Sequence, residues 1–80
     1  MNSLKLKLIY PEEKVKEPIL SKLCKTFDVD INIRKGNVQE HVGWLDLELI
    51  GSEDEIERAV KWLEEQGIEV SPLEGQVFME

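Results

Sequence analysis

The sequence has few of the residues on which metal, redox and disulfide chemistry depend. Its 80 residues include one cysteine, Cys24, and one histidine, His41. A single cysteine cannot close a disulfide within the chain, and a lone histidine does not make a metal site. We therefore expect no metal site and no cofactor. Cys24 is interpreted as a small buried or half-buried hydrophobic residue, and His41 as a solvated loop residue.

Long hydrophobic runs and basic clusters are missing as well. No apolar run approaches the roughly 20 residues of a membrane span, and residues 1–7 alternate in polarity instead of forming the continuous apolar stretch of a signal peptide. The net charge of -7 disfavours nucleic acid and anionic lipid, because both need a basic surface. With the single cysteine, these features predict a cytoplasmic protein with no nucleic-acid partner and no membrane insertion.

The motifs of several enzyme classes are also absent. The sequence contains no P-loop, no zinc-ligand spacing and no GxGxxG. The segment 10–13, Tyr-Pro-Glu-Glu, is acidic, so it would repel the anions that an acyl-phosphate hydrolase must hold. Aromatic residues make up 6% of the chain, and only Trp44 is placed to stack on a base. Since no nucleophile–base pair appears either, we predict that the chain is not an enzyme.

What the sequence does contain is the composition of one small folded domain. Hydrophobic residues make up 41% and charged residues 34%, as in a globular protein. The clearest pattern is the alternation of apolar and polar side chains over residues 43–51, which predicts a strand with one buried face. Helical spacing follows over residues 52–67. Ser52 and Glu55 are spaced as a capping box, and Gly67 is placed as a C-terminal cap.

The same reasoning predicts the order of the remaining elements. Alternation predicts strands at residues 4–8 and 29–33, and a helix starts near residues 17–18. A fourth strand opens at residues 68–70, and Pro72 indicates an edge strand or an early end. This strand-helix-strand-strand-helix-strand order predicts an α+β, ferredoxin-like fold, with a four-stranded antiparallel sheet and two helices on one face. Right-handed crossovers place strands one and three in the centre.

The apolar positions of these elements are expected to form one core between the helices and the sheet: Leu4, Leu6, Leu8, Ile19, Leu23, Phe27, Val29, Ile31, Ile33, Leu45, Leu47, Leu49, Ile56, Val60 and Leu63. The opposite face carries Lys5 and Lys7 beside Asp46 and Glu48, so opposite charges can pair across the strands. We expect this face of the sheet to be either exposed to solvent or turned toward a partner. Residues 53–55 are interpreted as solvated charges that the helix dipole favours.

Two residues on the polar face are candidates for binding. Trp44 is an exposed tryptophan that either lines a ligand site or belongs to a subunit interface. Asn32 interrupts a β-branched run in an edge strand, where it is either incidental edge decoration or a ligand-binding group. Residues 35–37 break the alternation and mark either a bulge or the start of a turn.

At this point the chain resembles the NIL domain, a small ferredoxin-like regulatory module. The resemblance extends from about Leu4 to Val70. It is carried by the segments Glu17-Pro18-Ile19-Leu20, Val29-Asp30-Ile31-Asn32-Ile33, Gly43-Trp44-Leu45-Asp46-Leu47-Glu48-Leu49-Ile50-Gly51 and Ile56…Ala59…Trp62-Leu63…Gly67-Ile68-Glu69-Val70. Such domains are similar to the C-terminal part of the ATPase subunit of methionine ABC importers. There they dimerise and bind methionine near the subunit interface. Other members stand alone or precede an iron–sulfur ferredoxin domain.

The resemblance implies a domain over residues 1–75 with a tail at residues 76–80. It also implies that Asn32 is a ligand contact, and with its neighbours Ile33 and Arg34 and the exposed Trp44 we expect a ligand site there. Arg34 replaces the leucine of the family motif and is able to pair with an amino-acid carboxylate. Two functions stay open. One is a homodimeric regulatory domain that binds methionine or another amino acid and reports to an ABC transporter. The other is a ligand-free interaction or dimerisation module tied to a ferredoxin or sulfur-metabolism protein.

Overall fold

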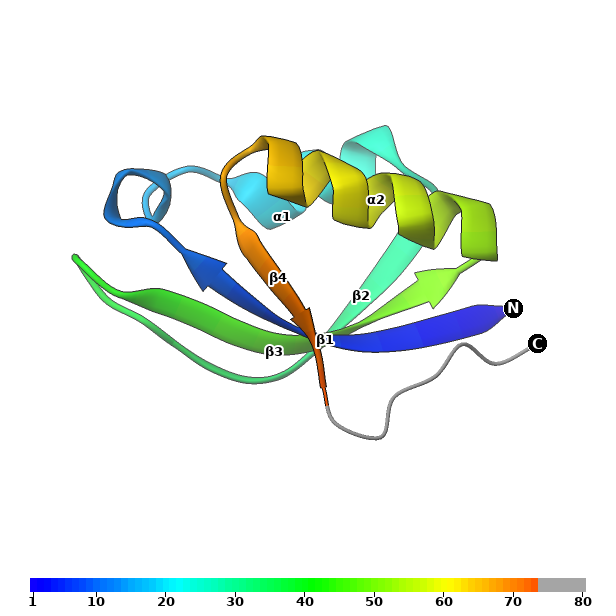
Figure 1. Ribbon diagram of the computed structural model, residues 1–80, viewed down its shortest axis with the longest axis horizontal. Helices are drawn as coiled ribbons and strands as arrows, with labels where there is room; N and C mark the ends of the chain where they lie inside the picture. The colour runs from blue at the N-terminus through cyan, green and yellow to red at the C-terminus, as the bar shows by residue number, and fades with distance from the viewer. Residues whose placement is uncertain (74–80) are drawn as a thin grey trace.

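The computed structural model describes residues 1–73, and its main elements follow the predicted order (Figure 1). Their bounds are β1 Asn2–Tyr10, α1 Ile19–Thr26, β2 Val29–Val38, β3 Gly43–Gly51, α2 Glu53–Glu65 and β4 Glu69–Pro72, with a short 3-10 helix, η1, at Glu12–Lys14. The predicted ferredoxin-like α+β fold is confirmed. The expected domain end at residue 75 and the tail at residues 76–80 lie outside the described residues.

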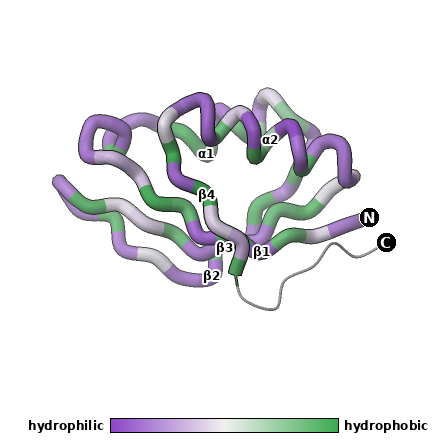
Figure 2. The backbone as a smooth tube through the Cα atoms, in the orientation of Figure 1, coloured by the Kyte–Doolittle hydropathy of each residue, from purple (hydrophilic) through white to green (hydrophobic). Residues whose placement is uncertain are grey.

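The strands form one antiparallel sheet in the order β2-β3-β1-β4, so the predicted central and edge strands are confirmed. Both helices lie on the same side of the sheet (Figure 1). Hydrophobic and hydrophilic residues alternate along much of β1 and β3, as the tube in Figure 2 shows. The two edges differ: β4 has four residues and ends at Pro72, whereas β2 has ten residues.

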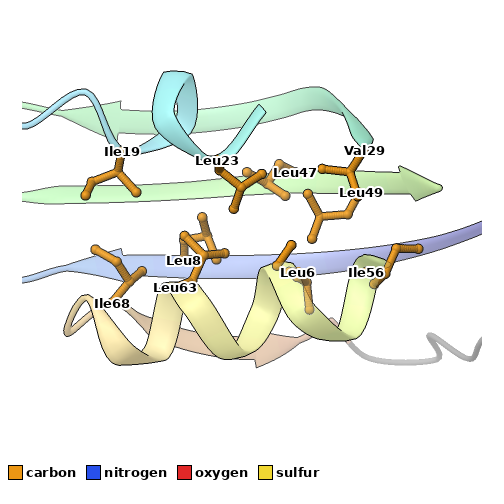
Figure 3. Packing of buried hydrophobic residues seen from close by; sticks show 11 residues of the cluster. Leu6, Leu8, Ile19, Leu23, Val29, Leu47, Leu49, Ile56, Leu63 and Ile68 are labelled. Carbon is orange, nitrogen blue, oxygen red and sulfur yellow. The ribbon is translucent and has the colours of Figure 1, made fainter. Parts of the chain in front are cut away.

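The core lies between the helices and the sheet (Figure 3). Its buried members are Leu6, Leu8, Ile19, Leu23, Val29, Leu47, Leu49, Ile56, Ala59, Leu63 and Ile68. Burial of each large aliphatic side chain contributes roughly 1.5–3 kcal/mol, so this layer holds the fold together. The prediction for Ile33 was wrong, because 56% of this residue is exposed. Ile33 pairs with the buried Leu47, but the eight-residue α1 does not cover it.

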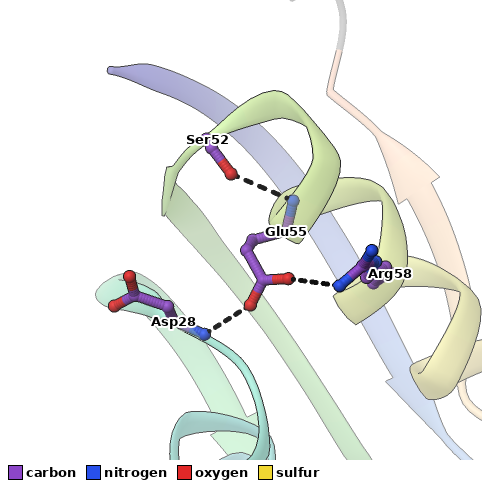
Figure 4. A network of polar contacts seen from close by, with 4 residues as sticks. All are labelled: Asp28, Ser52, Glu55 and Arg58. Atoms are coloured by element: carbon purple, nitrogen blue, oxygen red, sulfur yellow. Dashed lines mark hydrogen bonds and ion pairs between the residues drawn. The ribbon is translucent and has the colours of Figure 1, made fainter.

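The predicted serine and glycine caps of α2 are confirmed, but the capping box is only half formed, because the Glu55 carboxylate bonds to Asp28 and Arg58. The Ser52 hydroxyl accepts a hydrogen bond of 3.2 Å from the backbone N–H of Glu55 (Figure 4). At the other end Gly67 has a φ of 88°, and the N–H of Ile68 bonds to the Leu63 carbonyl at 3.0 Å. This is the Schellman arrangement, which needs a left-handed residue just after the helix. The caps fix where α2 begins and ends, and thereby how it lies on the sheet.

The Glu55 carboxylate was expected to be a solvated charge, and this expectation was wrong. Its Oε2 accepts a hydrogen bond of 2.8 Å from the backbone N–H of Asp28, and its Oε1 one of 3.2 Å from Arg58 (Figure 4). Asp28 stands between α1 and β2, so Glu55 ties the start of α2 to the turn that precedes the edge strand.

Cys24 is exposed, so its interpretation as a buried or half-buried residue was also wrong. The residues of α1 that enter the core fully are Ile19 and Leu23, which are four positions apart on one narrow stripe. Cys24 lies about 100° further round the helix than Leu23 and points away from that stripe.

Candidate functional site

An open hollow on the surface brings together side chains from β2, β3 and the segment just after β4. Its lining residues are Asn32, Ile33, Arg34, Lys35, Asp46 and Leu73, and its volume is about 670 Å³. Three of the four residues predicted as ligand contacts, namely Asn32, Ile33 and Arg34, therefore lie at one hollow. All three are exposed. The fold thus gathers most of the predicted site into one place.

A β-bulge in the edge strand shapes one wall of this hollow. Ile33 pairs with Leu47, and Lys35 pairs with the next residue of β3, Asp46, so Arg34 is the extra residue. The break in alternation predicted at residues 35–37 is confirmed as a bulge, although it begins one residue earlier and the strand continues to Val38. Bulges re-aim side chains and occur often beside functional sites. Here the bulge gives the hollow two consecutive cationic residues.

Asp46 is the acidic residue of the hollow. It is far less exposed than we expected for a residue on the polar face of the sheet. Only 5% of this residue is exposed, because side chains from the strands on both sides shield it. The nitrogen atoms of Lys7 and Lys35 each lie 3.9 Å from one of its oxygens. The predicted charge pairing across strands is confirmed for Lys7 and Asp46, while the prediction that Asp46 is solvated was wrong.

Trp44 lies two residues along β3 from Asp46 and outside the lining of the hollow. It is half-buried, and the ammonium of Lys7 lies 4.7 Å from the centroid of its ring. A cation at this distance from an indole contributes roughly 0.5–1 kcal/mol at an exposed site. Lys7 therefore links Trp44 to Asp46 across the open face of the sheet.

The single histidine lies in the loop of the β2–β3 hairpin and does not line this hollow. His41 is exposed in the loop between β2 and β3, as predicted, and its Nδ1 is hydrogen-bonded to the Glu12 carboxylate of η1. A second hollow lies between these segments. Within residues 1–73, no group of histidine, cysteine and acidic side chains is arranged to hold a metal ion. The same residues include no helix long and apolar enough to cross a membrane.

Sequence reasoning missed three residues of the hollow. Asp46 was placed in the correct strand, whereas Lys35 was placed at a bulge or at the start of a turn, and the opposite charges of the two residues were the available signal. The bulge that sets Lys35 opposite Asp46 was predicted only as one of two alternatives. Leu73 carried no signal, because it joins the hollow only through the pairing of β4 with β1 and its own N–H bond of 3.1 Å to the Lys5 carbonyl.

Comparisons with known proteins agree with the resemblance seen in the sequence. A family model described as the NIL domain matches residues 5–72. The chain is 37% identical over 71 residues to the methionine import ATP-binding protein MetN of Helicobacter hepaticus, covering 84% of the chain and 20% of that protein. It is 32% identical over 74 residues to the MetN of Halalkalibacterium halodurans, covering 88% of the chain and 22% of that protein.

A solved structure supports the same assignment. The C-terminal domain of an ABC transporter ATP-binding protein from Enterococcus faecalis superposes with a TM-score of 0.80 at 28% identity, covering 90% of this chain and 84% of that one. The chain spans about a fifth of the length of the curated relatives it matches. Given the family model that covers nearly all of its described residues, the chain belongs to the NIL domain family.

Proposed function

We propose that this chain is a non-catalytic regulatory domain that binds a free amino acid in the hollow beside β2, with methionine as the first candidate. The observation that carries the proposal is the lining itself, which combines one amide residue, two cationic residues, one acidic residue and two apolar residues. A small-molecule site needs this combination of a few convergent polar groups with apolar surface. The similarity to methionine import ATP-binding proteins selects methionine for the first test.

The lining matches the parts of an amino acid one by one. Arg34 and Lys35 offer N–H donors to a carboxylate, and a guanidinium binds a carboxylate through two parallel hydrogen bonds. Asn32 both donates and accepts hydrogen bonds, so its amide suits either polar group of the ligand. Leu73 offers apolar surface to the ligand side chain. A thioether chain suits such a surface because it is flexible and polarisable.

We further propose that two copies pair along β2 and close the hollow. β2 is a ten-residue edge strand, and exposed edges of this length are templates for pairing with another chain. Two exposed apolar residues of this strand, Ile33 and Val38, would lose solvent contact in such a pair; they are 56% and 55% exposed. A two-fold dimer built on one edge brings both hollows close to the symmetry axis.

In this proposal the occupied dimer reports to an ABC importer, either as part of its ATPase chain or as a separate partner. The similarity to ATP-binding proteins of methionine importers supports that partner. The alternative, an interaction module without a ligand, is favoured by the apolar groups exposed along the β2–β3 hairpin, Val38 and Val42, which suit a protein partner such as a ferredoxin.

Isothermal titration of the purified protein with L-methionine, L-leucine and a panel of other amino acids separates the two functions. We expect saturable heat with at least one amino acid, and loss of that heat in Asn32→Ala. An Arg58→Ala variant, altered on the outer side of α2, serves as a control that keeps binding. No heat and no thermal stabilisation across the panel would contradict the sensor proposal and favour the interaction module.

A further inference from the structure

Among the described residues Asp46 stands out, because it is a buried acidic side chain with an oxygen that makes no hydrogen bond. Its Oδ1 is buried and has no hydrogen-bond partner within the described residues. Asp46 is nevertheless one of the residues that line the hollow. A buried carboxylate oxygen without a hydrogen bond is costly, and such groups are rare in folded proteins unless a function retains them.

The two neighbouring lysines do not remove this cost. Each ammonium lies 3.9 Å from a carboxylate oxygen, which is beyond the reach of a charge-assisted hydrogen bond of about 2.7–2.9 Å. Lys7 is also placed over the Trp44 ring. The side chain of Lys35 is 71% exposed and can turn outward. The lysines therefore attract the Asp46 carboxylate but leave its hydrogen-bonding capacity unused.

We propose that Asp46 binds the ammonium group of the ligand and thereby restricts the site to amino acids with a free α-amino group. This inference rests on the proposed function and specifies its ligand class. On binding, Lys35 turns from Asp46 to the ligand carboxylate and joins Arg34 there. The bulge allows Lys35 to move from Asp46 to the ligand, since it sets Lys35 opposite Asp46 and places Arg34 next to Lys35. Asp46 would then face the ligand ammonium, while Arg34 and Lys35 face the ligand carboxylate, so the charges of the site complement those of a zwitterion.

The ligand itself provides the first test, which needs no variant. The wild-type protein is titrated with L-methionine and with des-amino-methionine, which keeps the thioether chain and the carboxylate but lacks the ammonium. Because a hydrogen bond to a buried charged group is involved, we expect the des-amino compound to bind roughly ten- to hundredfold more weakly. If L-leucine binds in place of methionine, L-leucine and des-amino-leucine form the pair.

Asp46→Asn and Glu48→Gln provide the second test. Both remove one negative charge from the same face of β3, but Glu48 is outside the lining of the hollow. We expect Asp46→Asn to weaken binding of the amino acid roughly ten- to hundredfold and to leave binding of the des-amino compound unchanged. Glu48→Gln should change the affinity for neither compound. Thermal melts establish that both variants are folded.

The outcomes separate this inference from the proposal on which it rests. Equal affinity of the wild-type protein for an amino acid and its des-amino analogue would overturn the role of Asp46 and leave an amino-acid site intact. The absence of binding to every amino acid of the panel would overturn both. Because the ligand pair is measured on the wild-type protein, a failure of Asp46→Asn to fold does not affect the decision.

Discussion

The two faces of the sheet are built from the same strands and differ in how their side chains become buried. On the helix-covered face, Leu47 and Leu49 are buried by elements that lie over them. On the open face, Asp46 is enclosed only by side chains of neighbouring strands, Lys7 and Lys35 among them. The first arrangement produces stability through apolar area, while the second holds a charge in a place that solvent hardly reaches. We therefore assign stability to the covered face and propose ligand recognition for the open face.

The largest effect is expected from truncating the covered face. Leu47→Ala removes a fully buried side chain and is expected to lower the free energy of unfolding by about 2–5 kcal/mol. Ile33→Ala is the matched control, because Ile33 pairs with Leu47 across the strands but is 56% exposed. We expect it to cost less than about 1 kcal/mol in chemical denaturation. If the two variants lost equal free energy of unfolding, Ile33 would belong to the buried part of the covered face, and our boundary for that face would be wrong.

A smaller effect is expected at the end of the helix that covers this face. Gly67→Ala forces a residue with a β-carbon into a left-handed conformation, at a cost of roughly 1–2 kcal/mol. An added β-carbon would meet no described atom within 4 Å, so the cost arises from the backbone alone. Thermal unfolding of Gly67→Ala and Gly67→Asn tests this, since asparagine tolerates the same conformation better and should recover part of the loss.

The bond between α2 and the turn before β2 should contribute about 1 kcal/mol. Glu55→Gln keeps the shape of the side chain but replaces a charge-assisted hydrogen bond to the Asp28 N–H with a neutral one. Glu57→Gln removes the same charge from an exposed position on α2 and serves as the control. If both variants unfold at the same denaturant concentration, Glu55 acts only as a helix-start charge.

The smallest effect is expected on the open face. Asn32→Ala changes an exposed edge residue and should alter stability by no more than about 0.5 kcal/mol. Denaturation curves of Asn32→Ala and Leu47→Ala, measured together, compare the two faces directly. A loss in Asn32→Ala similar to that in Leu47→Ala would show that the assignment of the two faces is wrong.

The sequence predicted the fold well because each element carries its own local signal. Alternation marked β1, β2 and β3, a serine and a glycine marked the ends of α2, and Pro72 marked the short edge strand. These signals depend on positions close together in the chain, and periodicity reports them directly. The exposure of Ile33 was missed because it depends on the length of α1, a separate element.

The lining of the hollow was predicted only in part, because it depends on long-range register. Asn32, Ile33 and Arg34 are consecutive, so a family motif identified them together. Asp46 and Leu73 join them only after β2 has paired with β3 and β4 with β1. The bulge shifts that register by one residue, and alternation alone does not determine where such a shift occurs.

The most direct test of amino-acid recognition on the open face is an amide NMR titration of the isotope-labelled protein with L-methionine and then with the rest of the panel. We expect saturable shifts at residues 32–35 and at Asp46, with α1 and α2 unchanged except where Glu55 meets the turn before β2. Shifts centred on the hollow beside Glu12 and His41, or no shifts with any amino acid, would contradict the assignment of recognition to this face.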